Sequence, residues 1–217
     1  MANNDASGKS IPFERFDHWA TFLLANLAWV IFAIPIVTLP LGTVGLFHVM
    51  SLWTRGKQPE FFRDFFEAIR KYWWKAMLVG LVDMLIGGMV VGNLLILNIM
   101  GFGNPLVLLA GGMTILVALM LVATNMYIWS LLVVAEFDLR RVVGLSLKLV
   151  LAHPFGTIRT LITGFLPLLL ALLLALPALI WLVGLVSLSA LFINRGTWKV
   201  IRRYIPESEL LIYETQD

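Results

Sequence analysis

Residues 76–134 have the sequence AMLVGLVDMLIGGMVVGNLLILNIMGFGNPLVLLAGGMTILVALMLVATNMYIWSLLVV, in which two long apolar runs flank the short segment NIMGFGNP. Each run is long enough to cross a bilayer, because about 20 helical residues span about 30 Å of hydrocarbon. The Asn-Pro pair and the glycines of the short segment are typical of a turn. The stretch therefore predicts two membrane-spanning helices joined as a hairpin.

Two other apolar blocks flank this hairpin. The first, residues 19–53, contains Pro35 and Pro40. Because proline kinks or ends a helix, we expect a broken first span. The last, residues 158–194, would measure about 52 Å as one straight helix of its roughly 35 apolar residues, which exceeds the membrane thickness. Two tilted helices divided near Pro177 fit better than one kinked helix, which stays an alternative.

The composition excludes a soluble globular protein. Of the 217 residues, 60% are hydrophobic and only 13% are charged, whereas soluble domains are about one quarter charged. We expect a single all-α membrane domain over residues 1–217, a polytopic transmembrane bundle of about five spans. If the first segment folds back at Pro40, the count becomes four spans plus a re-entrant hairpin.

Lysine and arginine lie unevenly along the chain. Six occur between residues 55 and 75, none between 98 and 105, four between 140 and 159, and four between 195 and 203. Cytoplasmic loops of membrane proteins carry an excess of these residues. We therefore expect residues 98–105 to lie outside the cell and the C-terminus to lie in the cytoplasm.

Four polar or amphipathic segments complete the chain. They are a polar N-terminal tail (1–18), an interfacial helix (58–75), a cytoplasmic amphipathic stretch (136–157) and a cytoplasmic tail (195–217). In residues 58–75, aromatic residues recur every four positions and charges fill the other side, as in helices that lie in the headgroup plane. Membrane anchoring and docking of a cytoplasmic partner are both compatible with this pattern. The candidate docking residues are Phe62, Arg63, Asp64, Phe66, Glu67 and Arg70.

Polar residues inside apolar segments are costly and are therefore candidate functional residues. Asp83 has either a structural role or a proton or substrate role, whereas Asn93 and Asn125 are expected to bond between helices. Gly88 and Gly92 form a small-xxx-small step that permits close helix packing. Candidate contacts to anionic lipids are Arg195, Lys199, Arg202 and Arg203.

The sequence has no recognisable catalytic motif. It lacks HExxH, GxSxG, a phosphate-binding loop and any cysteine. His18, His48 and His153 are on different segments and share no acidic cluster, which disfavours a metal site. We therefore expect a protein that is not an enzyme, with no cofactor, no metal and no nucleic-acid partner.

Residues 26–81 contain Asn26-x-x-Trp29, Pro35-x-x-Thr38 and the Phe-Arg-Asp-Phe-Phe sequence of residues 62–66. With these features, the segment resembles the first part of the YesL-like bacterial membrane proteins, a family with a domain of unknown function. Such proteins are often found beside carbohydrate uptake systems of the ATP-binding-cassette (ABC) type. The resemblance implies an accessory subunit in the bacterial cytoplasmic (inner) membrane, with ABC transporter permease subunits as candidate partners.

Three functions compete at this level. The preferred one is an accessory or scaffold subunit that contacts its partner through residues 58–75. An independent small-solute carrier or channel would need a water-filled path that touches Asp83, Asn93 or Asn125. A membrane enzyme acting on lipid would need titratable residues clustered at one interface, which the sequence lacks. The lipid bilayer is an expected partner in each case, and a homo-oligomer is compatible with the sequence.

Overall fold

The computed structural model describes residues 11–101, 103–174 and 184–210, and within these ranges the chain is helical and contains no strand. This confirms the predicted all-α fold. The elements are α1 (Ile11–Ala33), the short 3₁₀ helix η1 (Ile36–Thr38), α2 (Leu39–Thr54), α3 (Phe61–Met100), α4 (Pro105–Val134), α5 (Leu139–Ala152), α6 (Pro154–Leu173), α8 (Val186–Tyr204) and the 3₁₀ helix η3 (Glu207–Glu209).

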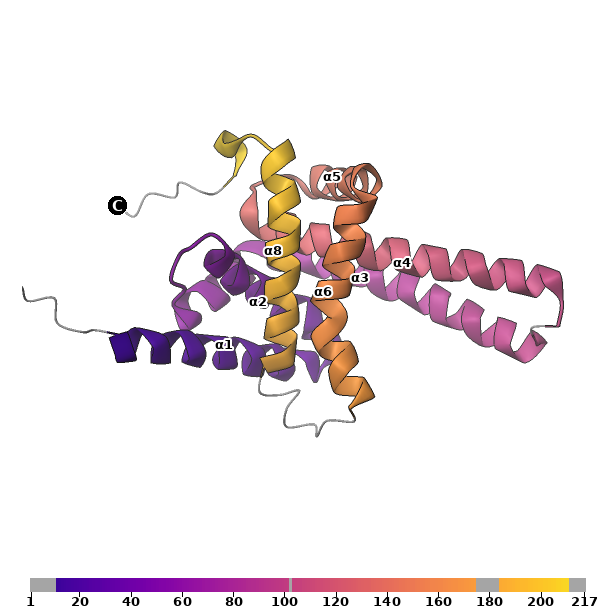
Figure 1. The fold of residues 1–217 in the computed structure, drawn as a ribbon, viewed down its shortest axis with the longest axis horizontal. Helices are drawn as coiled ribbons and strands as arrows, with labels where there is room; N and C mark the ends of the chain where they lie inside the picture. The colour runs from indigo at the N-terminus through magenta and orange to yellow at the C-terminus, as the bar shows by residue number, and fades with distance from the viewer. Residues whose placement is uncertain (1–10, 102, 175–183, 211–217) are drawn as a thin grey trace, which may run out of the picture.

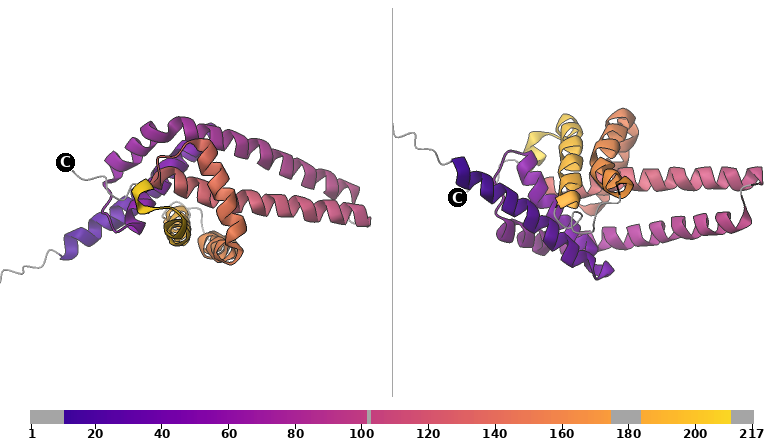
Figure 2. Two further views of the ribbon diagram at one scale, coloured as in Figure 1. Left: turned by 90° about the horizontal axis from the view of Figure 1, so that it is seen from above. Right: turned by 60° about the horizontal axis from the view of Figure 1, so that its bottom comes forward.

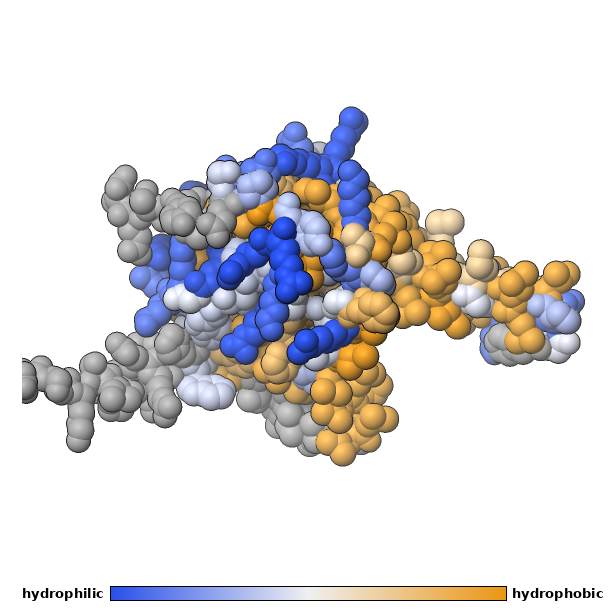
Figure 3. All heavy atoms as spheres, turned by 45° about the horizontal axis from the view of Figure 1, so that its top comes forward, coloured by the Kyte–Doolittle hydropathy of each residue, from blue (hydrophilic) through white to orange (hydrophobic). Residues whose placement is uncertain are grey.

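Four segments of the described chain are long and apolar enough to cross a membrane. They are Ile36–Thr54, Phe61–Met100, Pro105–Val134 and Pro154–Leu173. Figure 3 shows hydrophobic residues over the projecting arm that α3 and α4 form, and hydrophilic residues gathered over the opposite part of the molecule. The protein is therefore an integral membrane protein by the length, composition and surface of its helices.

The first apolar segment folds back on itself as the antiparallel pair α1 and α2. The Trp29 indole N–H donates to the Thr43 hydroxyl at 3.1 Å, and the Phe22 ring stacks on Trp53 with centroids 5.9 Å apart. The chain reverses around η1, where the Thr38 hydroxyl donates to the Phe32 carbonyl at 2.6 Å. Of the two arrangements compatible with the sequence, the structure has the folded-back one.

Helices α3 and α4 form the long hairpin that projects from the rest of the molecule (Figure 1). At its turn, Gly101 has a φ of 78°, a conformation that favours glycine. The Asn104 side chain caps α4 by accepting from the Leu106 amide at 2.9 Å, and Pro105 occupies the first helical turn.

The amphipathic residues 58–75 do not form a separate helix, because α3 runs without a break from Phe61 to Met100. The chain has neither a proline nor a glycine at the expected junction near Lys75. The line of buried side chains passes straight through this point, from Tyr72 to Ala76 and Val79. Continuous packing on one side thus keeps the amphipathic part and the span in one helix.

Helix α2 occupies the centre of the bundle and packs against α1, α3, α4 and α8. Glycines allow its closest approaches. A Cβ atom added at Gly45 would lie 2.8 Å from the Phe65 ring, and one added at Gly80 of α3 would overlap the Pro40 ring. The close packing predicted at Gly88 and Gly92 is not found within the described chain, because nothing lies within 4 Å of a Cβ added at either glycine.

Helices α6 and α8 form another antiparallel pair, and they run across the α3–α4 hairpin rather than alongside it (Figures 1 and 2). Gly164 meets Ile193, and Gly196 meets Thr160, so glycine again permits close contact. Pro177, where the sequence predicts a division, lies outside the described residues.

Replacement of Gly80 by valine should destabilise the protein, whereas Gly88→Val on the same helix should not. The Gly80 variant forces side-chain atoms into the rigid Pro40 ring, and overpacking of this kind costs about 1–3 kcal/mol. Denaturant titration of the detergent-purified protein, followed by helical circular dichroism, measures both free energies of unfolding. Equal stability of the two variants would contradict the packing described for α2 and α3.

Candidate functional site

The first four turns of α3 expose a row of aromatic side chains next to a row of charges. We define the α3 outer face as the exposed residues Phe62, Arg63, Phe66, Glu67 and Arg70. Phe62 and Phe66 are 69% and 48% exposed. The opposite side of the same turns is buried in the bundle. Packing of the opposite side therefore holds in place the helix that carries this face.

Asp64 is buried, whereas the other five candidate docking residues are exposed. It is only 6% exposed, and its carboxylate accepts from the Glu60 backbone N–H at 2.7 Å and from Arg63 Nε at 3.0 Å. Backbone N–H groups at a helix start lack partners within the helix, so a nearby carboxylate stabilises them. Asp64 thus holds the start of α3 and orients Arg63 beside it.

Two lysines fix the middle of this region to the connection between α4 and α5. The Lys71 ammonium pairs with the Glu136 carboxylate at 2.8 Å, and the Lys75 ammonium donates to the Phe137 carbonyl at 2.8 Å. The hydrogen bond from Lys71 holds the pKa of Glu136 below its ordinary value. These contacts join the bases of α3 and α4.

The basic residues of the C-terminal region gather on the last turns of α8. Arg195, Lys199, Arg202 and Arg203 are all exposed, and the last two lie in the final turn, where positive charge is favourable to the helix dipole. Their contact with anionic lipid stays a prediction.

The polar residues inside the α3–α4 hairpin come as hydrogen-bonded pairs. Asn125 Nδ2 donates to Asp83 Oδ1 at 2.7 Å, and the Asn93 side-chain amide donates to the Thr114 hydroxyl. The sequence predicts interhelical bonds for both asparagines but does not identify their partners. Asp83 and Asn93 lie about 15 Å apart along the helix axis at 1.5 Å per residue, so the pairs are separate features.

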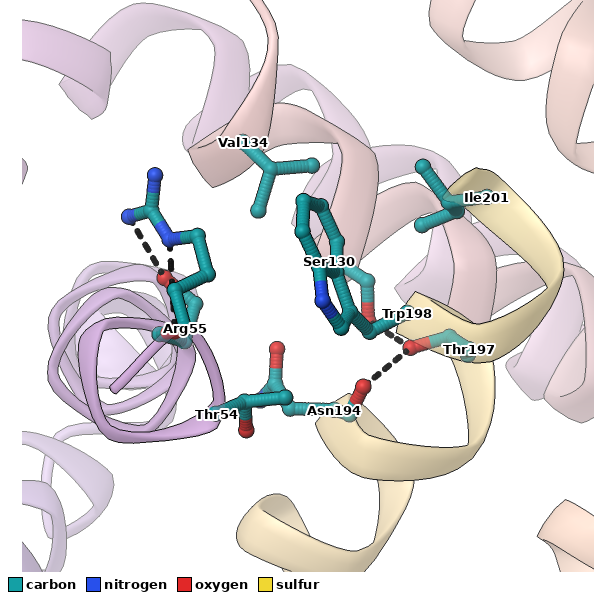
Figure 4. A pocket seen from close by; sticks show the side chains of 9 residues that line it. Thr54, Arg55, Ser130, Val134, Asn194, Thr197, Trp198 and Ile201 are labelled. Carbon is teal, nitrogen blue, oxygen red and sulfur yellow. Dashed lines mark hydrogen bonds between the residues drawn. The ribbon is translucent and has the colours of Figure 1, made fainter. Parts of the chain in front are cut away.

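A small polar pocket lies where α2, α4 and α8 meet (Figure 4). The sequence analysis does not predict it. Thr197 donates its hydroxyl proton to Ser130 Oγ at 2.8 Å, and Arg55 Nη2 donates to Ser51 Oγ at 3.3 Å. No carboxylate or imidazole lines the pocket. Because these hydroxyls have no general base beside them, the pocket fits a role in joining helices rather than in nucleophilic chemistry.

The described part of the chain contains no group of three or more His, Asp or Glu side chains that could hold a metal ion. His153 instead packs against the Tyr204 ring, with centroids 4.5 Å apart.

Comparison with protein families matches part of this chain to a family model. Residues 22–94 match the model of the family described as "Protein of unknown function, DUF624". The YesL-like resemblance is consistent with this family and is confirmed by the match. No curated protein and no solved structure matches the chain. The matched residues include the second half of α1, all of α2 and the larger part of α3.

Replacement of Asp64 by alanine should destabilise the protein by about 1 kcal/mol, a typical cost for a lost helix-start carboxylate. Replacement of the exposed Glu67 by alanine should change stability by no more than about 0.5 kcal/mol. Both free energies of unfolding can be measured by the same denaturant titration. If Glu67→Ala costs as much as Asp64→Ala, the assignment of Asp64 to the helix start is wrong.

Proposed function

We propose that this integral membrane protein, in which residues 22–94 match the DUF624 family model, is an accessory or scaffold subunit that is not an enzyme. It contacts a partner protein through the α3 outer face. The observation that carries this proposal is the exposure of Phe62 and Phe66 on a helix whose opposite side is already buried.

The chemistry of the α3 outer face favours a protein partner. Protein interfaces are enriched in aromatic residues and arginine, which supply most of the binding energy. Here Phe62 and Phe66 provide the aromatic surface, while Arg63, Glu67 and Arg70 provide charges of both signs beside it. A helix that only binds anionic lipid needs no acidic residue among its exposed charges.

The α3 outer face lies on the charged side of the molecule, which is consistent with a cytoplasmic location for this face. Lysine or arginine residues occur in the first turns of α3, at the exposed positions Arg140 and Lys148 of α5, and at the end of α8. The positive-inside rule would place these segments and the C-terminus in the cytoplasm. We therefore propose the bacterial cytoplasmic membrane as the location.

The proposed partner is a permease subunit of an ABC-type carbohydrate uptake system. Support for this choice comes from the resemblance to YesL-like proteins. An independent small-solute carrier or channel has less support, because Asp83, Asn93 and Asn125 are each bonded within the α3–α4 hairpin. A path for a polar solute would have to break these bonds.

Substitutions on the α3 outer face should weaken binding of the partner. The test is purification of the tagged protein from its native host in mild detergent, followed by mass spectrometry of the proteins that accompany it. Permease or ATPase subunits should accompany the wild type and should be reduced at least tenfold with Arg70→Glu or Phe66→Ala. Arg70 is preferred to Arg63 because Arg63 also contacts Asp64 at the helix start, and replacing it would remove that contact.

The matched control is Lys148→Glu, which reverses an exposed charge on α5 instead of α3. This variant should retain the partner. A wild-type preparation that contains only this chain would contradict the accessory function, and equal loss with Lys148→Glu would contradict the assignment to the α3 outer face.

A further inference from the structure

An apolar cavity of about 470 Å³ lies between α3, α4 and α5. Its walls include Val82 and Ile86 from α3 and Val117 from α4, while Leu139 and Val143 of α5 close one side. Cavities of roughly 300–1,000 Å³ with few polar groups are typical of small-molecule sites. Its size and lining therefore suit a largely hydrocarbon ligand.

Two hydrogen-bond acceptors in the cavity wall have room for a further donor, the Asp83 carboxylate and the Asn125 amide oxygen. The Asp83 carboxylate accepts one hydrogen bond, from Asn125 Nδ2 at 2.7 Å. Asn125 Oδ1 is buried and has no donor within the described residues. The Thr124 hydroxyl, also in the wall, already donates to the Met120 carbonyl at 2.7 Å. An acceptor left unsatisfied in an apolar wall is costly, and a carboxylate more so.

We propose that this cavity binds a single-chain amphiphile through an ammonium group placed against Asp83 and Asn125. An ammonium group brings three N–H donors and a positive charge, which complement a carboxylate and a free amide oxygen. The alkyl chain fills the space between Val82, Ile86 and Val117. This ligand site is separate from the α3 outer face and does not depend on the partner proposed there.

The cavity volume selects the ligand size. A volume of 470 Å³ holds roughly 16 water-sized groups at about 30 Å³ each. This suits one medium-length alkyl chain with a small head, whereas a whole diacyl phospholipid is too large. Asp83 lies about 12 Å along the helix from Lys75 at 1.5 Å per residue, and no lysine or arginine lines the cavity, so an ammonium group there meets no basic side chain.

The test is saturable binding of tritiated dodecylamine to the full chain in phosphatidylcholine nanodiscs, with binding to empty nanodiscs subtracted. Unlabelled dodecylamine should displace the probe at least tenfold more effectively than dodecanol, which has the same chain but no charge. Phosphatidylethanolamine added to the nanodisc should not displace it. Displacement by this lipid would overturn the assignment to a single-chain ligand.

Three variants test whether dodecylamine binds in the cavity between α3, α4 and α5. Asp83→Asn should weaken dodecylamine binding at least tenfold, and Ile86→Trp should abolish it by filling the cavity without removing the carboxylate. Asn93→Leu, which breaks the other polar pair of the same hairpin outside the cavity, should bind like the wild type. No saturable binding to the wild type, equal displacement by dodecanol, or full binding by Ile86→Trp would each overturn the proposal.

Discussion

The burial of α2 between α1, α3, α4 and α8 is the constraint on which the rest of the structure depends. This helix has 16 residues and is about 24 Å long, and together with η1 it forms the segment Ile36–Thr54, which is long and apolar enough to cross a membrane. Gly45 lets the Phe65 ring lie against α2, and Pro40 lies against Gly80. Small residues at helix contacts are the usual means of close packing in membranes, where no hydrophobic effect drives helices together.

The folded-back α1–α2 pair has a functional consequence. Because α1 and α2 are antiparallel, the start of α1 lies on the same side of the bundle as the start of α3 (Figure 1). The bases of α3 and α4 are then joined through Lys71 and Glu136. The α3 outer face is therefore displayed from a fixed base, while the α3–α4 hairpin projects from it as an apolar arm (Figure 2). This arrangement separates the exposed aromatic and charged residues of the α3 outer face from the apolar arm.

Hydropathy and turn residues were sufficient to predict the membrane class, the all-α fold and the turn at Asn104 and Pro105, because these depend on local composition. Properties that depend on packing were not predictable. The sequence pattern predicts a break near Lys75, but α3 is continuous there because one side of the helix is buried on both sides of this point.

The candidate site shows the same limit. Phe62 and Phe66 are exposed, as a docking role requires, whereas Asp64 points to the start of its own helix. Ser130 and Thr197 form their bond across 67 positions of the chain, and neither residue belongs to a local motif. The DUF624 match ends at residue 94, so it covers neither Ser130 nor Thr197.

The most direct test of the α2 arrangement is a disulfide between Phe32→Cys and Gly42→Cys. The chain has no cysteine of its own, and a Cβ added at Gly42 would lie 2.7 Å from Phe32 Cβ. Oxidation in membranes should protect both thiols from maleimide–polyethylene glycol, but not those of the control pair Trp19→Cys and Gly42→Cys. In a straight helix positions 32 and 42 are about 15 Å apart, too far for a disulfide, so free thiols in the test pair would contradict the folded-back core.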